Sequence, residues 1–383
     1  MIDPARLDLW LAARERDMLA LLERIVNIDS GSHDHAGVTA VAEAIAAFLE
    51  GEGVAVEWLP QERSGHILRA RVARPPGAPI LLLGHCDTVF PKGEAARRPF
   101  RIEAARAFGP GVADMKGGLV MNAFVLAAFA RLGGAPCPLL GLFTSDEEIG
   151  SPVSRPIIEA TAKGCRAVFN AEPGRPSGNV CNARNGGIFA RLRIEGRAAH
   201  AGSAWAEGRS AILELAHKTI ALAQLSAPDA GITVNVGVVR GGQSVNTVAS
   251  WAEAEVDLRY RRLADRDRLL SAVHAIVARA SVPETRAEFA IEGEFLPLEP
   301  TPASDRLLAL YQEAANAAGF AVAAEFSGGC ADSGFTAALG VPTLCSLGPV
   351  GGKSHTPEEY VEVETLLPRA RALARTILLL AAQ

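Results

Sequence analysis

Residues 79–87 read PILLLGHCD, and this stretch decides the fold. Four aliphatic residues, 80–83, can form a short strand that is buried on both faces, as in a parallel sheet. A glycine follows, and His85 and Asp87 then share one face because side chains alternate along an extended segment. Open α/β folds bind ligands at the carboxyl ends of such strands. Taken alone, the pattern also fits a polar turn after a core strand.

Strand and helix patterns alternate through the first half of the chain. Each pattern has the length and the apolar period that its type of element requires. We expect helices at 4–27, 37–50 and 119–132, and strands at 54–58, 67–72, 80–83, 138–143 and 167–170. This alternation predicts an α/β domain with a mostly parallel sheet flanked by helices.

The pattern changes after residue 176. Residues 187–197, GIFARLRIEGR, alternate apolar and polar side chains with a period of two, which is typical of a half-exposed strand. Further strands are expected at 232–239, 247–258 and 287–291, and helices at 210–225 and 265–279. These elements predict a smaller α+β sandwich with one open sheet face. Doubly buried patterns return afterwards, with helices at 304–318 and 362–382 and strands at 322–326 and 342–346. We therefore expect a first domain formed by residues 1–175 and 292–383, interrupted by a second at 176–291.

Composition excludes several classes of protein. A chain of 383 residues is too long for one compact core, and 49% hydrophobic with 21% charged residues is ordinary for a globular protein. The net charge of −5 offers no basic patch for nucleic acid. Six dispersed cysteines without a C-x-x-C pair predict reduced thiols and a cytoplasmic protein. A signal peptide is not expected, because charges recur every few residues near the N-terminus and leave no continuous apolar region. A membrane span is not expected either, because no apolar run approaches 18 residues.

Histidines and carboxylates gather at five points, each just after a predicted strand or in a glycine-rich loop. They are His85 with Asp87, Asp114, Glu147 with Glu148, Glu172, and His355. Singly, each has a simpler explanation: Asp114 could cap the following helix, and Glu147 and Glu148 could form a solvated turn. Together they should meet at one sheet edge, where carboxylates repel one another unless a cation or a proton compensates.

The residue types at these points favour a metal centre. Two histidines and several carboxylates, without a cysteine, suit Zn²⁺, and Co²⁺ or Mn²⁺ can share such ligands. There are more ligands than one tetrahedral site needs, which suggests two ions. Such a site can activate a water and polarise a carbonyl. One of the adjacent Glu147 and Glu148 could bind metal while the other serves as the general base.

A set of motifs then resembles a known family over essentially the whole chain. The motifs are GHCDTVF, FGPGVADMKGG, SDEEIGS, NAEPG, GRAAHAG, DLRY and SHTPEEY, in the family's order. They resemble the co-catalytic zinc metallopeptidases that include bacterial glutamate carboxypeptidase, acetylornithine deacetylase and succinyl-diaminopimelate desuccinylase. The first two motifs look closest to the glutamate carboxypeptidase branch.

The resemblance implies two zinc ions per subunit and a role for each residue. Glu147 would be the general base, acting on a metal-bridging water, and Asp87 would orient the His85 imidazole. The implied metal ligands are His85 and Glu172 for the first ion, Asp114 for both, and Glu148 and His355 for the second.

The insert resembles the family's dimerisation domain, also called a lid, and implies a homodimer. His200 would reach the partner's active site and stabilise the oxyanion, while Asn246 and Arg259 would hold the substrate's carboxylate. For Arg259 a surface salt bridge is the alternative, and for His200 a solvent-facing loop position. Cys330 and Ala331 depart from the small hydroxyl residues that many relatives carry in the loop SGGCADSG.

The sequence thus predicts a dinuclear zinc metallohydrolase that cleaves an amide bond next to a free carboxylate. A glutamate carboxypeptidase is the first choice within that class. An N-acyl-amino-acid deacylase of the acetylornithine type is the alternative, since its chemistry is identical and only its pocket differs. A metal-free, non-catalytic binding relative is a third hypothesis, although no implied ligand is missing from this chain.

Overall fold

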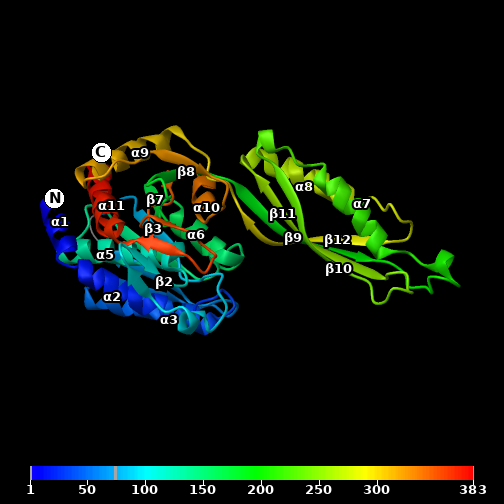
Figure 1. Cartoon of the computed structure of the whole chain (residues 1–383). Coiled ribbons are helices and arrows are strands. Elements are labelled where there is room, and N and C mark those ends of the chain that lie inside the picture. Colours follow the sequence, from blue (N-terminus) through cyan, green and yellow to red (C-terminus); the bar gives the residue numbers. More distant parts are fainter. Residues whose placement is uncertain (1, 73–75, 383) are drawn as a thin grey trace. The chain divides into compact units, whose positions relative to one another are not determined.

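The computed structural model describes residues 2–72 and 76–382, which divide into two compact units (Figure 1). Unit 1 comprises the chain up to Arg184, Leu298–Ser327, and the chain from Ala331 onward. Unit 2 comprises Asn185–Pro297 with Gly328–Cys330. The sequence-based boundaries at 175 and 291 precede these divisions.

Unit 1 is built on a six-stranded sheet (Figure 1). The antiparallel pairs β1–β2 and β2–β6 lie at one side, and β6, β3, β7 and β14 continue the sheet in parallel. In spatial order the strands are β1 (Ala55–Leu59), β2 (Ile67–Val72), β6 (Leu139–Thr144), β3 (Ile80–His85), β7 (Ala167–Asn170) and β14 (Thr343–Leu344). The expected mostly parallel α/β sheet is confirmed.

Strand β3 lies at the centre of this sheet, and all six of its residues are buried. Ile80 and Leu82 pack into the main hydrophobic core, together with the helix α5 (Gly117–Arg131). Every residue from Gly117 to Phe129 is buried, because α5 contacts β2, β3 and β6 as well as other helices. The segment Val112–Arg131 is apolar and long enough to cross a membrane, but 94% of its most apolar 18-residue window is buried inside the protein. It is therefore the core helix of unit 1.

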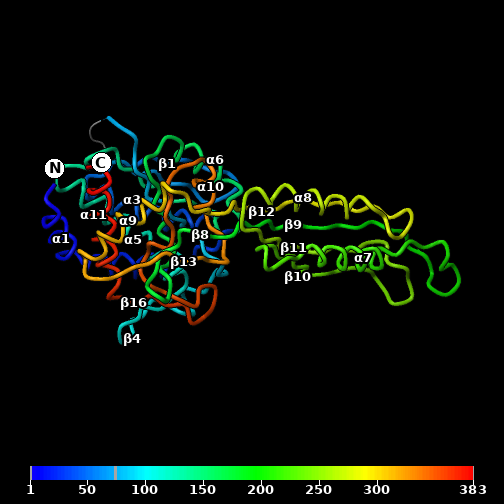
Figure 2. Tube along the Cα trace, turned by 90° about the horizontal axis from the view of Figure 1, so that it is seen from above, coloured from blue at the N-terminus to red at the C-terminus, as the bar shows by residue number. Residues whose placement is uncertain are grey.

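Further helices surround the sheet. The first and last helices, α1 (Pro4–Ala12) and α11 (Leu366–Ala381), lie side by side in both views (Figures 1 and 2). The others in unit 1 are α2 (Glu15–Val26), α3 (His35–Gly51), α4 (Glu94–Arg97), α6 (Ser154–Ala162), α9 (Pro302–Ala317) and α10 (Ser333–Ala338). The single helix expected at 4–27 is wrong, since it is interrupted between α1 and α2. Arg14 leaves the helical conformation there, and its guanidinium pairs with Glu52 at 3.0 Å.

Two small sheets were not expected from the sequence, although β13 (Ala324–Ser327) of the first overlaps the strand expected at 322–326. Their other strands, of two to five residues, carry little periodic signal. The first sheet contains β8 (Val180–Arg184) and β13, which are parallel. The other is antiparallel, in the order β15 (Gly351–Gly352), β16 (Tyr360–Glu362), β5 (Arg106–Phe108) and β4 (Arg101–Glu103). Its β5–β16 pairing brings the loop after residue 108 next to the loop before residue 360.

Unit 2 is an antiparallel sheet with two helices on one face (Figure 1). The strand order is β10 (Thr233–Gly241), β11 (Trp251–Tyr260), β9 (Gly186–Glu195) and β12 (Arg286–Phe295), and the helices are α7 (Ala211–Ala223) and α8 (Leu263–Ala278). Ile188 and Leu192 of β9 pack into the core beneath the helices, whereas Arg191 forms ion pairs with glutamates of neighbouring strands. The half-exposed character of β9 is confirmed, but β11 begins at Trp251 and not at residue 247.

Candidate active site

Three parallel neighbours in the sheet of unit 1 position four of the predicted site residues. His85 ends β3, Glu147 and Glu148 follow β6, and Glu172 follows β7. Because these strands run in parallel, their carboxyl ends lie at one edge of the sheet. Asp114 reaches this edge from the irregular turn Val112–Lys116 before α5, and His355 reaches it from the loop between β15 and β16.

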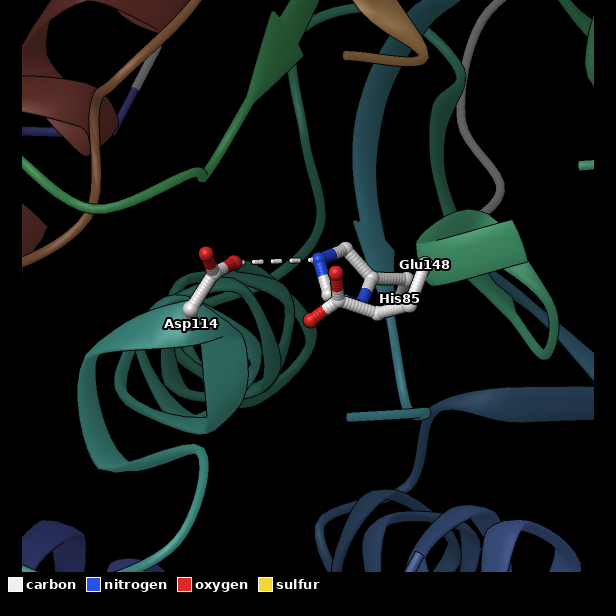
Figure 3. A group of neighbouring side chains, drawn as sticks. All are labelled: His85, Asp114 and Glu148. Atoms are coloured by element: carbon white, nitrogen blue, oxygen red, sulfur yellow. Dashed lines mark ion pairs between the residues drawn. The ribbon is translucent and has the colours of Figure 1, made fainter. Parts of the chain in front are cut away.

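Asp114 lies between the two histidines. Its Oδ1 is 3.3 Å from His85 Nε2, and its Oδ2 is 3.3 Å from His355 Nε2. Glu172 Oε1 lies 3.5 Å from His85 Nε2, and Glu148 Oε2 lies 3.3 Å from His355 Nε2. Figure 3 shows Asp114 and Glu148 converging on the His85 ring. Each carboxylate oxygen of Asp114 thus faces a different imidazole, which is the arrangement that a bridging ligand requires.

Two buried atoms support a cation at this place. Among the described residues, His85 Nε2 and Glu172 Oε1 have no hydrogen-bond partner, although they lie 3.5 Å apart. A buried polar atom without a partner is costly, and both atom types are common ligands of Zn²⁺. The donor set of two imidazoles and three carboxylates therefore fits the implied metal.

Crowding of acidic groups shifts the pKa values at this edge. Burial, reinforced by neighbouring carboxylates, raises the pKa of Glu147 well above its usual range and that of Glu148 to about 7. Burial lowers the pKa of His85, but contacts with Asp114 and other carboxylates outweigh it and raise the pKa well above normal. Hydrogen bonds to Asp114 and Glu148 raise the pKa of His355 to about 10. Protons thus balance the charge here, and a bound metal would replace them.

Asp87, which is predicted to orient the His85 imidazole, contacts it and also hydrogen-bonds the turn that carries Glu147 and Glu148. His85 Nδ1 lies 3.0 Å from the backbone carbonyl of Asp87 and 3.4 Å from its Oδ1, so this residue does contact the imidazole. The buried carboxylate also accepts the backbone N–H groups of Glu147 (3.1 Å) and Glu148 (3.0 Å) and the Ser32 hydroxyl (2.7 Å). Asp87 therefore fixes the turn that carries Glu147 and Glu148. This contact exists because β3 and β6 are neighbours in the sheet, so the His-x-Asp spacing alone does not predict it.

Glu359 was missed by the sequence analysis. Its buried carboxylate accepts three backbone N–H groups, from Gly111 (3.1 Å), Ala113 (2.8 Å) and Asp114 (2.9 Å). The pair Glu358–Glu359 looks like an ordinary acidic turn in the sequence. Nothing in that pattern indicates that one of the two is buried.

Arg184 and Asp332 also lie beside the centre. Arg184, at the end of β8, is buried with Nη2 3.7 Å from Glu172 Oε2, and it donates to the Ser346 hydroxyl at 3.3 Å. Asp332, just before α10, accepts a hydrogen bond from the Thr144 hydroxyl at 3.4 Å, and burial raises its pKa to about 7. Arg184 places a positive charge next to a predicted ligand, which only the fold reveals.

The remaining predicted residues belong to unit 2. His200 is exposed in a loop, and its Nδ1 accepts the backbone N–H groups of Gly202 and Ser203, both at 3.1 Å. Asn246 is also exposed, and its Oδ1 accepts the Ser244 hydroxyl at 2.9 Å. Their assigned roles remain predictions.

Arg259 is engaged within unit 2. Its Nε and Nη2 donate to the two oxygens of Asp257 at 2.6 and 2.7 Å, and its Nη1 donates to Cys330 Sγ at 2.7 Å. The guanidinium also lies over the Phe189 ring, 5.0 Å from its centroid. Cys330 thus occupies a position beside the predicted carboxylate-binding group, and that role of Arg259 also remains a prediction.

Comparisons with known proteins agree with this geometry. Residues 81–379 match peptidase family M20/M25/M40. Carboxypeptidase G2 from Pseudomonas sp. (strain RS-16) is 28% identical over 373 residues, which cover 94% of this chain and 88% of that protein.

Two solved structures show the same fold. The M20 family metallo-carboxypeptidase Sso-CP2 from Sulfolobus solfataricus has a TM-score of 0.81 and 16% identity, with 96% of this chain and 99% of that chain covered. The dipeptidase Dug1p from Saccharomyces cerevisiae has a TM-score of 0.75 and 16% identity, with 100% and 99% covered. Because the family match spans most of the sequence, this chain belongs to peptidase family M20/M25/M40 and is a metallopeptidase.

Proposed function

We propose that this metallopeptidase is a dinuclear zinc carboxypeptidase that releases an amino acid, glutamate first of all, from an amide bond next to its free carboxylate. The observation that carries this proposal is the placement of Asp114 between the two histidines, with one oxygen 3.3 Å from each Nε2. A carboxylate in this position can serve two ions at once. The similarity to carboxypeptidase G2 supports the choice of substrate class.

Two zinc ions, held by His85, Asp114 and Glu172 and by Asp114, Glu148 and His355, would lower the pKa of a water molecule and polarise the scissile carbonyl. Glu147 Oε2 lies 3.9 Å from His85 Nε2, farther than the oxygens of Asp114 and Glu172. Glu147 is therefore assigned to proton transfer and not to metal binding. Its raised pKa is what a proton carrier needs near neutral pH. Glu147 accepts the proton of the attacking water and delivers it to the leaving amine.

The insert would complete the site in a homodimer, with His200 from the partner stabilising the oxyanion and Asn246 and Arg259 binding the carboxylate. Exposed apolar side chains support an interface on unit 2: Ile220 of α7 is 62% exposed and Val239 of the neighbouring edge strand β10 is 59% exposed. All six cysteines lie in the described part of the chain as reduced thiols, which supports a cytoplasmic location.

A substrate panel tests the proposed class. Purified protein loaded with Zn²⁺ should hydrolyse N-acyl-glutamates and peptides with C-terminal glutamate, and it should lose this activity when a chelator removes the metal. Preference for N-acetyl-ornithine would replace the carboxypeptidase with the deacylase alternative. Absence of any amidase activity in zinc-loaded protein would contradict the proposal.

A further inference from the structure

Two segments that are distant in sequence meet at the metal centre. The turn Val112–Lys116 carries Asp114, and the loop between β15 and β16 carries His355. Strand pairing brings the segments together, since Tyr360 of β16 lies opposite Phe108 of β5. The β5–β16 pairing ends before this turn, so the backbone N–H groups of Gly111, Ala113 and Asp114 lie beyond that ladder.

Glu359 accepts hydrogen bonds from these three N–H groups. Its side chain is fully buried, and its Oε1 accepts the N–H groups of both Ala113 and Asp114, while its Oε2 accepts that of Gly111. Glu358, its neighbour, is exposed. The two adjacent glutamates therefore have different environments, and only Glu359 contacts the turn that carries Asp114.

The hydrogen bonds between Glu359 and the turn of Asp114 satisfy polar groups on both sides. Asp114 and Met115 have non-helical backbone angles, so the N–H groups of this turn do not all find the partners that a regular helix would provide. A buried carboxylate is in turn costly unless hydrogen bonds compensate for its lost hydration. Three backbone N–H groups converge on Glu359, and these bonds offset part of the cost of burying its side chain.

We propose that Glu359 is a positioning residue that fixes Asp114 and ties it to His355, four residues earlier in the chain. By holding the Asp114 backbone, Glu359 sets where the carboxylate stands between the two histidines. By belonging to the same loop as His355, it keeps Asp114 Oδ2 and His355 Nε2 at their separation of 3.3 Å. This inference rests on the proposed two-metal function and adds a residue that controls assembly of the centre.

Zinc binding to metal-free protein tests the proposal without any assay of turnover. Zn²⁺ is titrated against a competing chelator into the wild type, Glu359→Gln, Glu359→Ala and the matched control Glu358→Ala. Mutation of a residue that hydrogen-bonds to a metal ligand typically lowers metal affinity about 10–100-fold. We expect a loss of that size for Glu359→Ala, a smaller loss for Glu359→Gln, which keeps one accepting oxygen, and wild-type affinity for Glu358→Ala.

Hydrogen exchange on the same metal-free proteins separates positioning from general stability. The amides of residues 111–114 should exchange faster in both Glu359 variants, while the amides of β3 and α5 keep wild-type protection. Glu359→Gln serves as the test if Glu359→Ala does not fold. Wild-type zinc affinity in a folded Glu359 variant would overturn the inference and leave the proposed function standing. Failure of the wild type to bind zinc would overturn both.

Discussion

Replacing Asp87 with asparagine should destabilise unit 1 even when no metal is bound. The carboxylate is fully buried and accepts three hydrogen bonds, two of them from the turn that carries Glu147 and Glu148. In Asp87→Asn, the remaining oxygen can accept the N–H of Glu148 and the Ser32 hydroxyl. The new amide NH₂ then faces the N–H of Glu147, so a donor meets a donor.

The expected loss follows from these contacts. A hydrogen bond to a charged group contributes roughly 1.5–3 kcal/mol, and a buried donor left without a partner costs about 1–3 kcal/mol. Removing the buried charge returns part of its desolvation penalty. The free energy of unfolding should therefore fall by about 2–4 kcal/mol, which a domain with a typical stability of about 5–15 kcal/mol survives.

Urea unfolding in excess chelator measures this loss without interference from metal. Asp17→Asn is the matched control, because that carboxyl group is 59% exposed and lies 3.7 Å from Arg14. The control should change the free energy of unfolding by less than about 0.5 kcal/mol. A loss for Asp87→Asn no larger than that of the control would refute the assignment of Asp87 as the residue that holds the turn.

Three further outcomes are expected. Chelation should lower the melting temperature of the wild type and added Zn²⁺ should restore it, because the metal binds only the folded centre; an unchanged melting temperature in differential scanning calorimetry would argue against a metal site. Phe124→Ala should cost about 3–5 kcal/mol in urea unfolding, since this buried ring of α5 stacks on Phe48 with centroids 4.3 Å apart; a loss below about 1 kcal/mol would mean that α5 is not the core helix. Burial raises the pKa of Glu52, but Arg131 and Arg14 outweigh it and lower the pKa below its usual value, so the stabilisation is present at neutral pH and is lost as the pH falls through that lowered pKa. Glu52→Gln should therefore destabilise the protein by less than about 1 kcal/mol at pH 7 and by less still in acid, and a difference that grows in acid would contradict this assignment.

Much of the architecture was accessible from sequence because strong periodic signals mark it. The buried run of β3 and the alternation of β9 each match the structure closely. The elements that the sequence analysis missed are those with weak periodic signals. The strands β4, β5, β15 and β16 are too short to show a period. The break between α1 and α2 at Arg14 interrupts a continuous apolar period, so the period alone does not reveal it.

The site divides in the same way. Histidines and carboxylates that follow strands could be found by their position, and the structure gathers His85, Asp114, Glu148, Glu172 and His355 at one edge. Residues that hold the turns carrying these side chains could not be found, because their hydrogen-bond partners are backbone N–H groups of another segment. Glu359 is the clearest case, since only the pairing of β5 with β16 brings it under the turn of Asp114.

Turnover of Glu147→Gln, measured on protein with verified zinc content, tests the central claim most directly. The variant keeps the size of the side chain but cannot accept a proton, and no predicted metal ligand is removed. The account predicts full zinc content and a rate of amide hydrolysis lower by roughly 10²–10⁴-fold, the usual contribution of a general base. Near-wild-type turnover with zinc bound would contradict it.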